Sequence, residues 1–157
     1  MPKSTTADAL YRAALAALAR REYAVAELRA RLGKSGAPGD IEAVLSTLCR
    51  EGLLSDTRYA VARSNAGRRR GWGPMRLRHE LELHGVAPET IAEVVEDSSR
   101  RWTEEAEQVR RRRFGMPLPE NHREVARQAR FLKGRGFTME QIRRVLRPAR
   151  NDDFEQG

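Results

Sequence analysis

Apolar residues recur at intervals of three and four along most of the chain, which is the spacing of half-buried α-helices. Near the N-terminus, Leu10, Ala14 and Leu18 share one helical stripe, and a second stripe runs from Val25 to Leu32. Runs of alternating β-branched residues, which would indicate strands, do not occur. The pattern therefore predicts an all-α fold.

A repeat of about 50 residues organises these helices. At three places a leucine is followed four residues later by a glycine, and an isoleucine comes five or six residues after that glycine. Because a left-handed glycine commonly ends a helix, we expect each copy to be a three-helix unit whose glycine ends the second helix. The members are Leu32, Gly36 and Ile41; Leu81, Gly85 and Ile91; and Leu132, Gly136 and Ile142.

The period predicts three tandem three-helix repeats, at residues 7–52, 53–99 and 100–147, followed by a flexible tail at 148–157. Asp56 is expected to cap the first helix of the second repeat, and Thr138 with Gln141 matches a capping box at the last helix. Units this small bury little apolar surface, so neighbouring repeats should pack on one another in an elongated, curved array.

Composition excludes several classes of protein. The chain has 157 residues, a third of them charged, and a formal charge of +8. It has no apolar stretch of about 20 residues that could span a membrane, and its N-terminal residues do not resemble a signal peptide. A single cysteine, Cys49, excludes an internal disulfide and is expected on a buried helix face. We therefore expect a cytoplasmic protein with no membrane association.

Catalysis is not expected. The histidines His79, His84 and His122 lack metal-ligand spacing, and the glycine-rich residues 67–73 lack the ending of a phosphate-binding loop. The nearest carboxylate cluster, residues 104–107, is spread around a helix. The sequence predicts no metal, no cofactor and no enzymatic activity.

Positive charge is concentrated in two regions. Residues 57–79 contain seven arginines and no acidic residue, and residues 100–150 contain 15 basic residues against six acidic ones. Such stretches repel themselves unless an anionic partner is bound. Helix-turn-helix recognition, in which third helices enter the major groove, is disfavoured because residues 88–97 carry four carboxylates. A basic surface from the second and third repeats is preferred.

Three segments resemble the RecX regulators of the bacterial recombinase RecA. They are residues 51–60 (EGLLSDTRYA), residues 71–81 (GWGPMRLRHEL) and residues 131–138 (FLKGRGFT). The resemblance covers essentially residues 7–147 and includes the three repeats. Ser55 departs from the acidic residue that the family commonly has beside Asp56.

The resemblance implies a non-enzymatic modulator that binds the RecA–DNA filament and opposes its growth, ATP hydrolysis, strand exchange and co-protease activity in the SOS response. We expect a monomer, although the sequence leaves open whether monomers suffice. Groove coating and end capping of the filament both stay open. Single- and double-stranded DNA are expected as weak or filament-associated partners. The alternative is a general DNA-binding or architectural protein that uses the same surface. The contact residues predicted on this basis are Arg68, Arg69, Arg70, Arg76, Arg78, Arg127, Arg130, Lys133, Arg135, Arg143 and Arg144.

Overall fold

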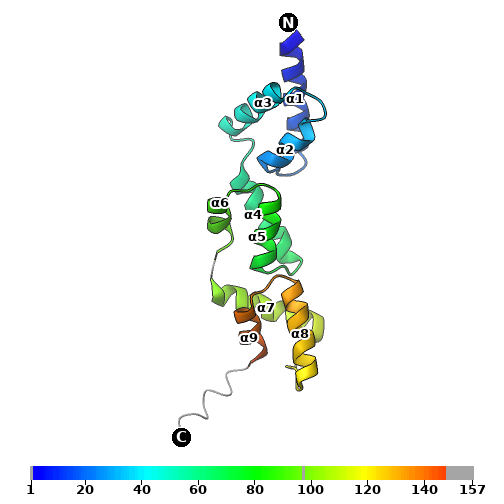
Figure 1. Cartoon of the computed structure of the whole chain (residues 1–157), viewed down its shortest axis with the longest axis vertical. Helices are drawn as coiled ribbons and strands as arrows, with labels where there is room; N and C mark the ends of the chain where they lie inside the picture. The colour runs from blue at the N-terminus through cyan, green and yellow to red at the C-terminus, as the bar shows by residue number, and fades with distance from the viewer. Residues whose placement is uncertain (1, 97, 148–157) are drawn as a thin grey trace. The chain divides into compact units, whose positions relative to one another are not determined.

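The computed structural model describes residues 2–96 and 98–147, and their side chains from residue 6 onward. This part of the chain contains nine helices and no strand, which confirms the predicted all-α repeat class (Figure 1). The predicted tail at 148–157 lies outside the described residues. The helices are α1 (Pro2–Leu18), α2 (Val25–Leu32), α3 (Pro38–Arg50), α4 (Asp56–Arg69), α5 (Pro74–Leu83), α6 (Pro88–Val94), α7 (Ser99–Phe114), α8 (His122–Gly134) and α9 (Met139–Leu146).

The helices form two compact units, which we describe one at a time. The N-terminal unit comprises the described residues of 1–64 and 80–94, and the C-terminal unit comprises those of 65–79 and 95–157. This division follows compactness rather than the sequence period. The three repeat boundaries therefore stay a prediction.

In the N-terminal unit, α1, α2 and α3 pack around one apolar core. The stripes predicted from the sequence supply this core, because residues three and four apart lie on the same face of a helix. Its most deeply buried large side chains are Leu28 and Leu48. Cys49, by contrast, is exposed, so the prediction that it is buried was wrong. It directly follows the buried Leu48, and one residue along a helix turns the side chain about 100° away.

The residue that caps α4 differs from the prediction. The Ser55 hydroxyl accepts the backbone N–H of Arg58 at 3.2 Å, which is the capping bond. The carboxylate of Asp56 instead accepts the backbone N–H of Val25 at 2.8 Å. Asp56 therefore satisfies a free amide at the start of α2, and Ser55 takes over the capping.

Two of the three repeat glycines adopt the predicted left-handed conformation. Gly85 has φ of 77° and Gly136 has φ of 97°, and each follows the end of a helix. Gly36 has no positive φ, so the prediction was wrong there. Its constraint is steric, because a Cβ at Gly36 would lie 2.7 Å from Cδ1 of Leu10.

In the C-terminal unit, α7, α8 and α9 pack on one another. Trp102, Leu132 and Ile142 contribute buried side chains from the three helices. The Thr138 hydroxyl accepts the Gln141 N–H at 3.2 Å, and the Gln141 side chain accepts the Thr138 N–H at 2.9 Å. The predicted capping box is therefore confirmed.

Backbone contacts join the start of α5 to the turn between α8 and α9. Gly73 N–H donates to Arg135 O at 2.7 Å, and Met75 N–H donates to Gly136 O at 2.9 Å. The two backbone segments approach so closely that a Cβ on Gly73 would lie 2.5 Å from backbone atoms of Gly136 and Phe137. Residues 73–75 and 135–137 form a junction that only glycine at position 73 allows.

Substituting Gly73→Ala should lower the free energy of unfolding by about 2–3 kcal/mol, because the new methyl group meets backbone that cannot rotate away. Gly134→Ala is the matched control, since a Cβ there has no neighbour within 4 Å. The control should be neutral or stabilising by up to about 1 kcal/mol. Chemical denaturation of both variants measures the difference, and equal stabilities would contradict the junction.

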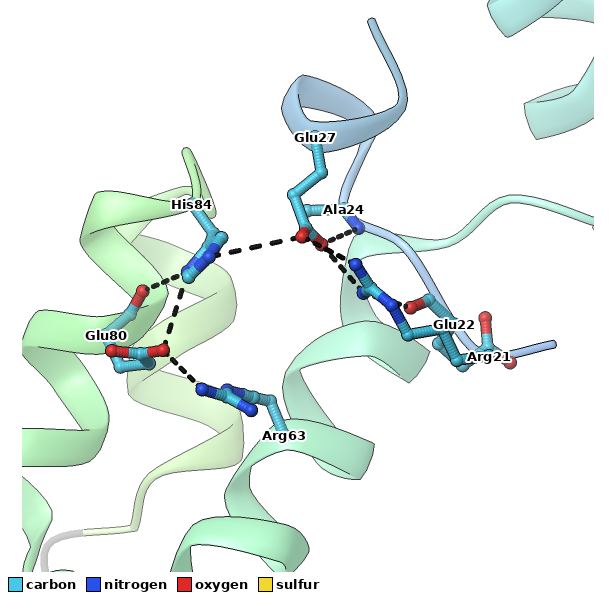
Figure 2. Close-up of polar contacts among 7 residues, drawn as sticks. All are labelled: Arg21, Glu22, Ala24, Glu27, Arg63, Glu80 and His84. Carbon is cyan, nitrogen blue, oxygen red and sulfur yellow. Dashed lines mark hydrogen bonds and ion pairs between the residues drawn. The ribbon is translucent and has the colours of Figure 1, made fainter. Parts of the chain in front are cut away.

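A polar network occupies the N-terminal unit beside the start of α2 (Figure 2). Glu27 accepts from the Arg21 guanidinium at 3.1 Å and from the Ala24 N–H at 3.1 Å. His84 lies 4.0 Å from the carboxylates of both Glu27 and Glu80, and its Nδ1 is 2.8 Å from the Glu80 carbonyl. Burial raises the pKa of Glu27, but the hydrogen bonds from Arg21 and Ala24 outweigh it, so the pKa lies below its ordinary value.

Glu27→Gln should therefore destabilise the fold above the ordinary carboxyl pKa of about 4.3. The folded-state pKa of Glu27 is lowered, so its stabilising contribution is present at neutral pH and is lost as the pH falls through that value. We expect a loss of about 1 kcal/mol at pH 7, typical of a screened ion pair. Thermal unfolding from pH 7 to pH 3 checks this, and a difference between variant and parent that does not shrink in acid would refute it.

Candidate anion-binding interface

All eleven basic residues predicted as contacts lie in the C-terminal unit. The junction brings the two groups of arginines together. Arg76, near the start of α5, lies beside Gly136, and its guanidinium carbon is 4.3 Å from the Trp72 ring centroid. Arg135 donates from Nη1 to the Arg70 carbonyl oxygen at 3.1 Å. Arginines that are about 60 residues apart in sequence therefore share one surface.

Arg68 has a structural role. Its guanidinium donates to both carboxylate oxygens of Glu105 on α7, and its carbon lies 4.8 Å from the Trp102 ring centroid. The Arg68 side chain is only 20% exposed. A partly desolvated ion pair of this kind fixes α4 against α7, so Arg68 is a poorer contact candidate than its neighbours.

Five arginines line a groove of about 210 Å³, which we call the arginine groove. Arg69 and Arg70 come from the end of α4, Arg112 and Arg113 from α7, and Arg135 from the residue after α8. Its other lining residues are Gly71, Val109 and Phe131. The sequence prediction included three of the five arginines. It missed Arg112 and Arg113, because periodicity does not tell which exposed face of α7 meets another element.

The remaining predicted contacts differ in how they are neutralised. Arg127 pairs with Glu124 at 3.2 Å, and Arg144 pairs with Glu140 at 2.7 Å. Arg78 is half buried and makes an interaction of its own. Three exposed side chains have no hydrogen bond or ion pair within residues 2–96 and 98–147, namely those of Arg130, Lys133 and Arg143. The charge available for a partner therefore differs from residue to residue.

Arg110 was not predicted from the sequence, yet it is fully buried. It donates to the carbonyl oxygens of Gly115, Met116 and Pro117 and pairs with Glu107 at 2.8 Å. Burial raises the pKa of Glu107, but hydrogen bonds from Arg110 and Arg111 outweigh it, and the pKa is lowered. Arg110 thus fixes the backbone of residues 115–117, which follow α7.

The described residues contain no group of three His, Cys, Asp or Glu side chains placed to hold a metal ion. The carboxylates of residues 104–107 each pair with arginine: Glu104 with Arg100, Glu105 with Arg68, and Glu107 with Arg110. None of the helices in this part of the chain is long and apolar enough to cross a membrane.

Comparisons with known proteins agree with this geometry. Family models described as the second and third three-helix domains of RecX match residues 55–95 and 103–146. The crystal structure of RecX from Lactobacillus salivarius shares the fold, with a TM-score of 0.77 at 16% identity over 90% of this chain and 95% of that one. Fold and surface thus define a protein of helical three-helix repeats with a basic face.

Two relatives named regulatory protein RecX are similar over nearly their whole length. The protein from Halorhodospira halophila is 44% identical, with 96% of this chain and 93% of the relative covered. The protein from Pseudomonas syringae pv. tomato is 39% identical, with 94% and 96% covered. The chain belongs to the RecX family of regulatory proteins, and the resemblance drawn from the sequence motifs is confirmed.

The neighbouring pair Arg68 and Arg69 provides a test of which arginines are structural. Arg68→Gln should lower the free energy of unfolding by about 1–3 kcal/mol, because Glu105 loses its partner in a partly buried position. Arg69→Gln should change it by less than about 0.5 kcal/mol, as for other exposed positions. Urea denaturation of the two variants compares them, and equal losses would show that Arg68 does not hold α4 against α7.

Proposed function

We propose that this chain regulates the RecA recombinase by binding the RecA–DNA filament and opposing its growth. ATP hydrolysis, strand exchange and co-protease activity then fall, because each requires the filament. The observation that carries the proposal is the match to RecX regulatory proteins over almost the entire chain. The arrangement of basic side chains in the C-terminal unit supports it.

The geometry suits a regulator that acts by binding alone. A filament repeats its protein and phosphate surfaces, so one monomer can make several modest contacts at once, and their combined affinity exceeds that of each contact. The arginine groove, Arg76 on Trp72 and the unpaired Arg130, Lys133 and Arg143 are the contacts we assign to this surface. Exposed, partnerless arginines supply charge without a carboxylate to compensate it.

General DNA binding is the second candidate, and the carboxylate-free lining of the arginine groove favours it. A protein of this kind would bind naked DNA and filament with comparable affinity. Its binding would fall steeply with salt, by about 0.9 log units per log unit of salt for each phosphate contacted on duplex DNA. The two candidate functions therefore differ in whether the recombinase increases the affinity of this chain for DNA.

Titrating the protein into RecA and single-stranded DNA should lower DNA-dependent ATP hydrolysis at ratios near one molecule per several protomers. The variant Arg69→Glu with Arg70→Glu should require several-fold more protein, while keeping its helical circular dichroism. A matched control is Arg12→Glu with Arg20→Glu, which reverses the same charge on α1 and the residues after it. An unchanged ATPase rate with the parent protein would overturn the proposed function.

A further inference from the structure

The arginine groove concentrates charge without internal compensation. Its eight lining residues include five arginines and no carboxylate. By contrast, a second groove of about 240 Å³ contains Glu105, which Arg68 neutralises. Five guanidinium groups around one small volume repel each other, so the lining is stabilised when an anion enters.

Three of the five arginines are held in place by neutral groups. Arg135 and Arg113 lie over the Phe131 ring, with guanidinium carbons 5.1 Å and 5.7 Å from its centroid. Phe114 packs against that ring in a T-shaped arrangement, at a centroid distance of 5.3 Å. Arg70 lies 5.9 Å from the Trp72 centroid. Contacts with aromatic rings orient a guanidinium and leave its charge intact.

Arg69 and Arg112 are the two groups left to meet a ligand directly. Both are exposed, and neither side chain has a hydrogen bond or ion pair within the described part of the chain. They come from different helices, α4 and α7, and both grooves contain them. The Arg70 carbonyl, an acceptor that would repel an anion, is already occupied by Arg135.

The two grooves adjoin, because they share Arg69, Gly71, Val109 and Arg112. Neighbouring grooves that share two arginines suit a linear polyanion better than a single ion. The aromatic ring that lines the arginine groove, Phe131, is covered by two guanidinium groups. Protein partners usually bind around exposed apolar or aromatic anchors, whereas nucleic-acid interfaces are more polar and more positive.

We propose that the arginine groove binds consecutive phosphates of a nucleic-acid strand, with Arg69 and Arg112 in direct contact and Arg70, Arg113 and Arg135 supplying the surrounding positive charge. The inference deepens the proposed function, on which it rests, by making the DNA of the filament the partner of this groove. Guanidinium groups suit the task because each can donate two parallel hydrogen bonds to one phosphate.

The test measures binding of the whole 157-residue chain to a short labelled oligothymidylate by fluorescence anisotropy across a salt series. The variant Arg69→Gln with Arg112→Gln should bind roughly tenfold more weakly. Its salt slope should be smaller by about 1.4, from about 0.7 for each lost phosphate contact on a single strand. The control Arg20→Gln with Arg100→Gln removes the same charge at exposed positions outside the groove and should keep the parent slope.

An unchanged affinity and slope in the groove variant would overturn the proposal, as would an equal loss in the control. Two competitors test the ligand class. Polyglutamate that displaces the strand as well as DNA does at equal charge would assign the groove to acidic protein. Tripolyphosphate that displaces it equally well at equal phosphate concentration would assign it to an isolated anion. The assay contains no recombinase, so its failure leaves the ATPase result untouched.

Discussion

The close approach of the backbone at Gly73 to that at Gly136 is the constraint on which the basic surface depends. Two hydrogen bonds hold residues 73–75 against 135–136, and the space between these two segments leaves no room for a side chain at Gly73. Backbone hydrogen bonds of this kind fix position more firmly than contacts between long, flexible side chains. Arg70, Arg76 and Arg135 consequently lie near one another although they belong to different repeats.

Carboxylates decide which arginines are available to a partner. Where a glutamate is within reach, as for Arg68 and Arg110, the guanidinium stabilises the fold. Where aromatic rings or solvent surround it, as for Arg135 and Arg69, the charge is left uncompensated. A chain with a formal charge of +8 therefore contains both structural arginines and arginines suited to a polyanion. The number of arginines in a stretch does not separate the two kinds.

Sequence periodicity predicted the helices, their order and the capping box at Thr138, because these features depend on residues three or four apart. It failed where a residue interacts with another residue that is far away in the sequence. Asp56 matched a capping position but bonds the amide of Val25, and Gly36 is small because Leu10 packs against it. The burial of Arg110 was missed for the same reason, since its partners lie in the loop that follows α7.

The arginines of the candidate site likewise fall into two groups, those that the sequence predicted and those that only the packing of the helices reveals. Charge runs in the sequence located Arg69, Arg70 and Arg135, because they stand in the two basic stretches. Arg112 and Arg113 join them only through the packing of α7 against the end of α4 and against α8, and no local pattern encodes that. Likewise, the prediction could not separate Arg68 from Arg69, which adjoin in sequence but differ in their partners.

Co-sedimentation with RecA-coated and with bare single strands, at physiological ionic strength, shows whether this chain binds the filament or only its DNA. If the chain is a filament regulator, most of it should sediment with the coated strands and much less with the bare ones. Equal recovery with both would contradict the account, because the recombinase would then add nothing to binding.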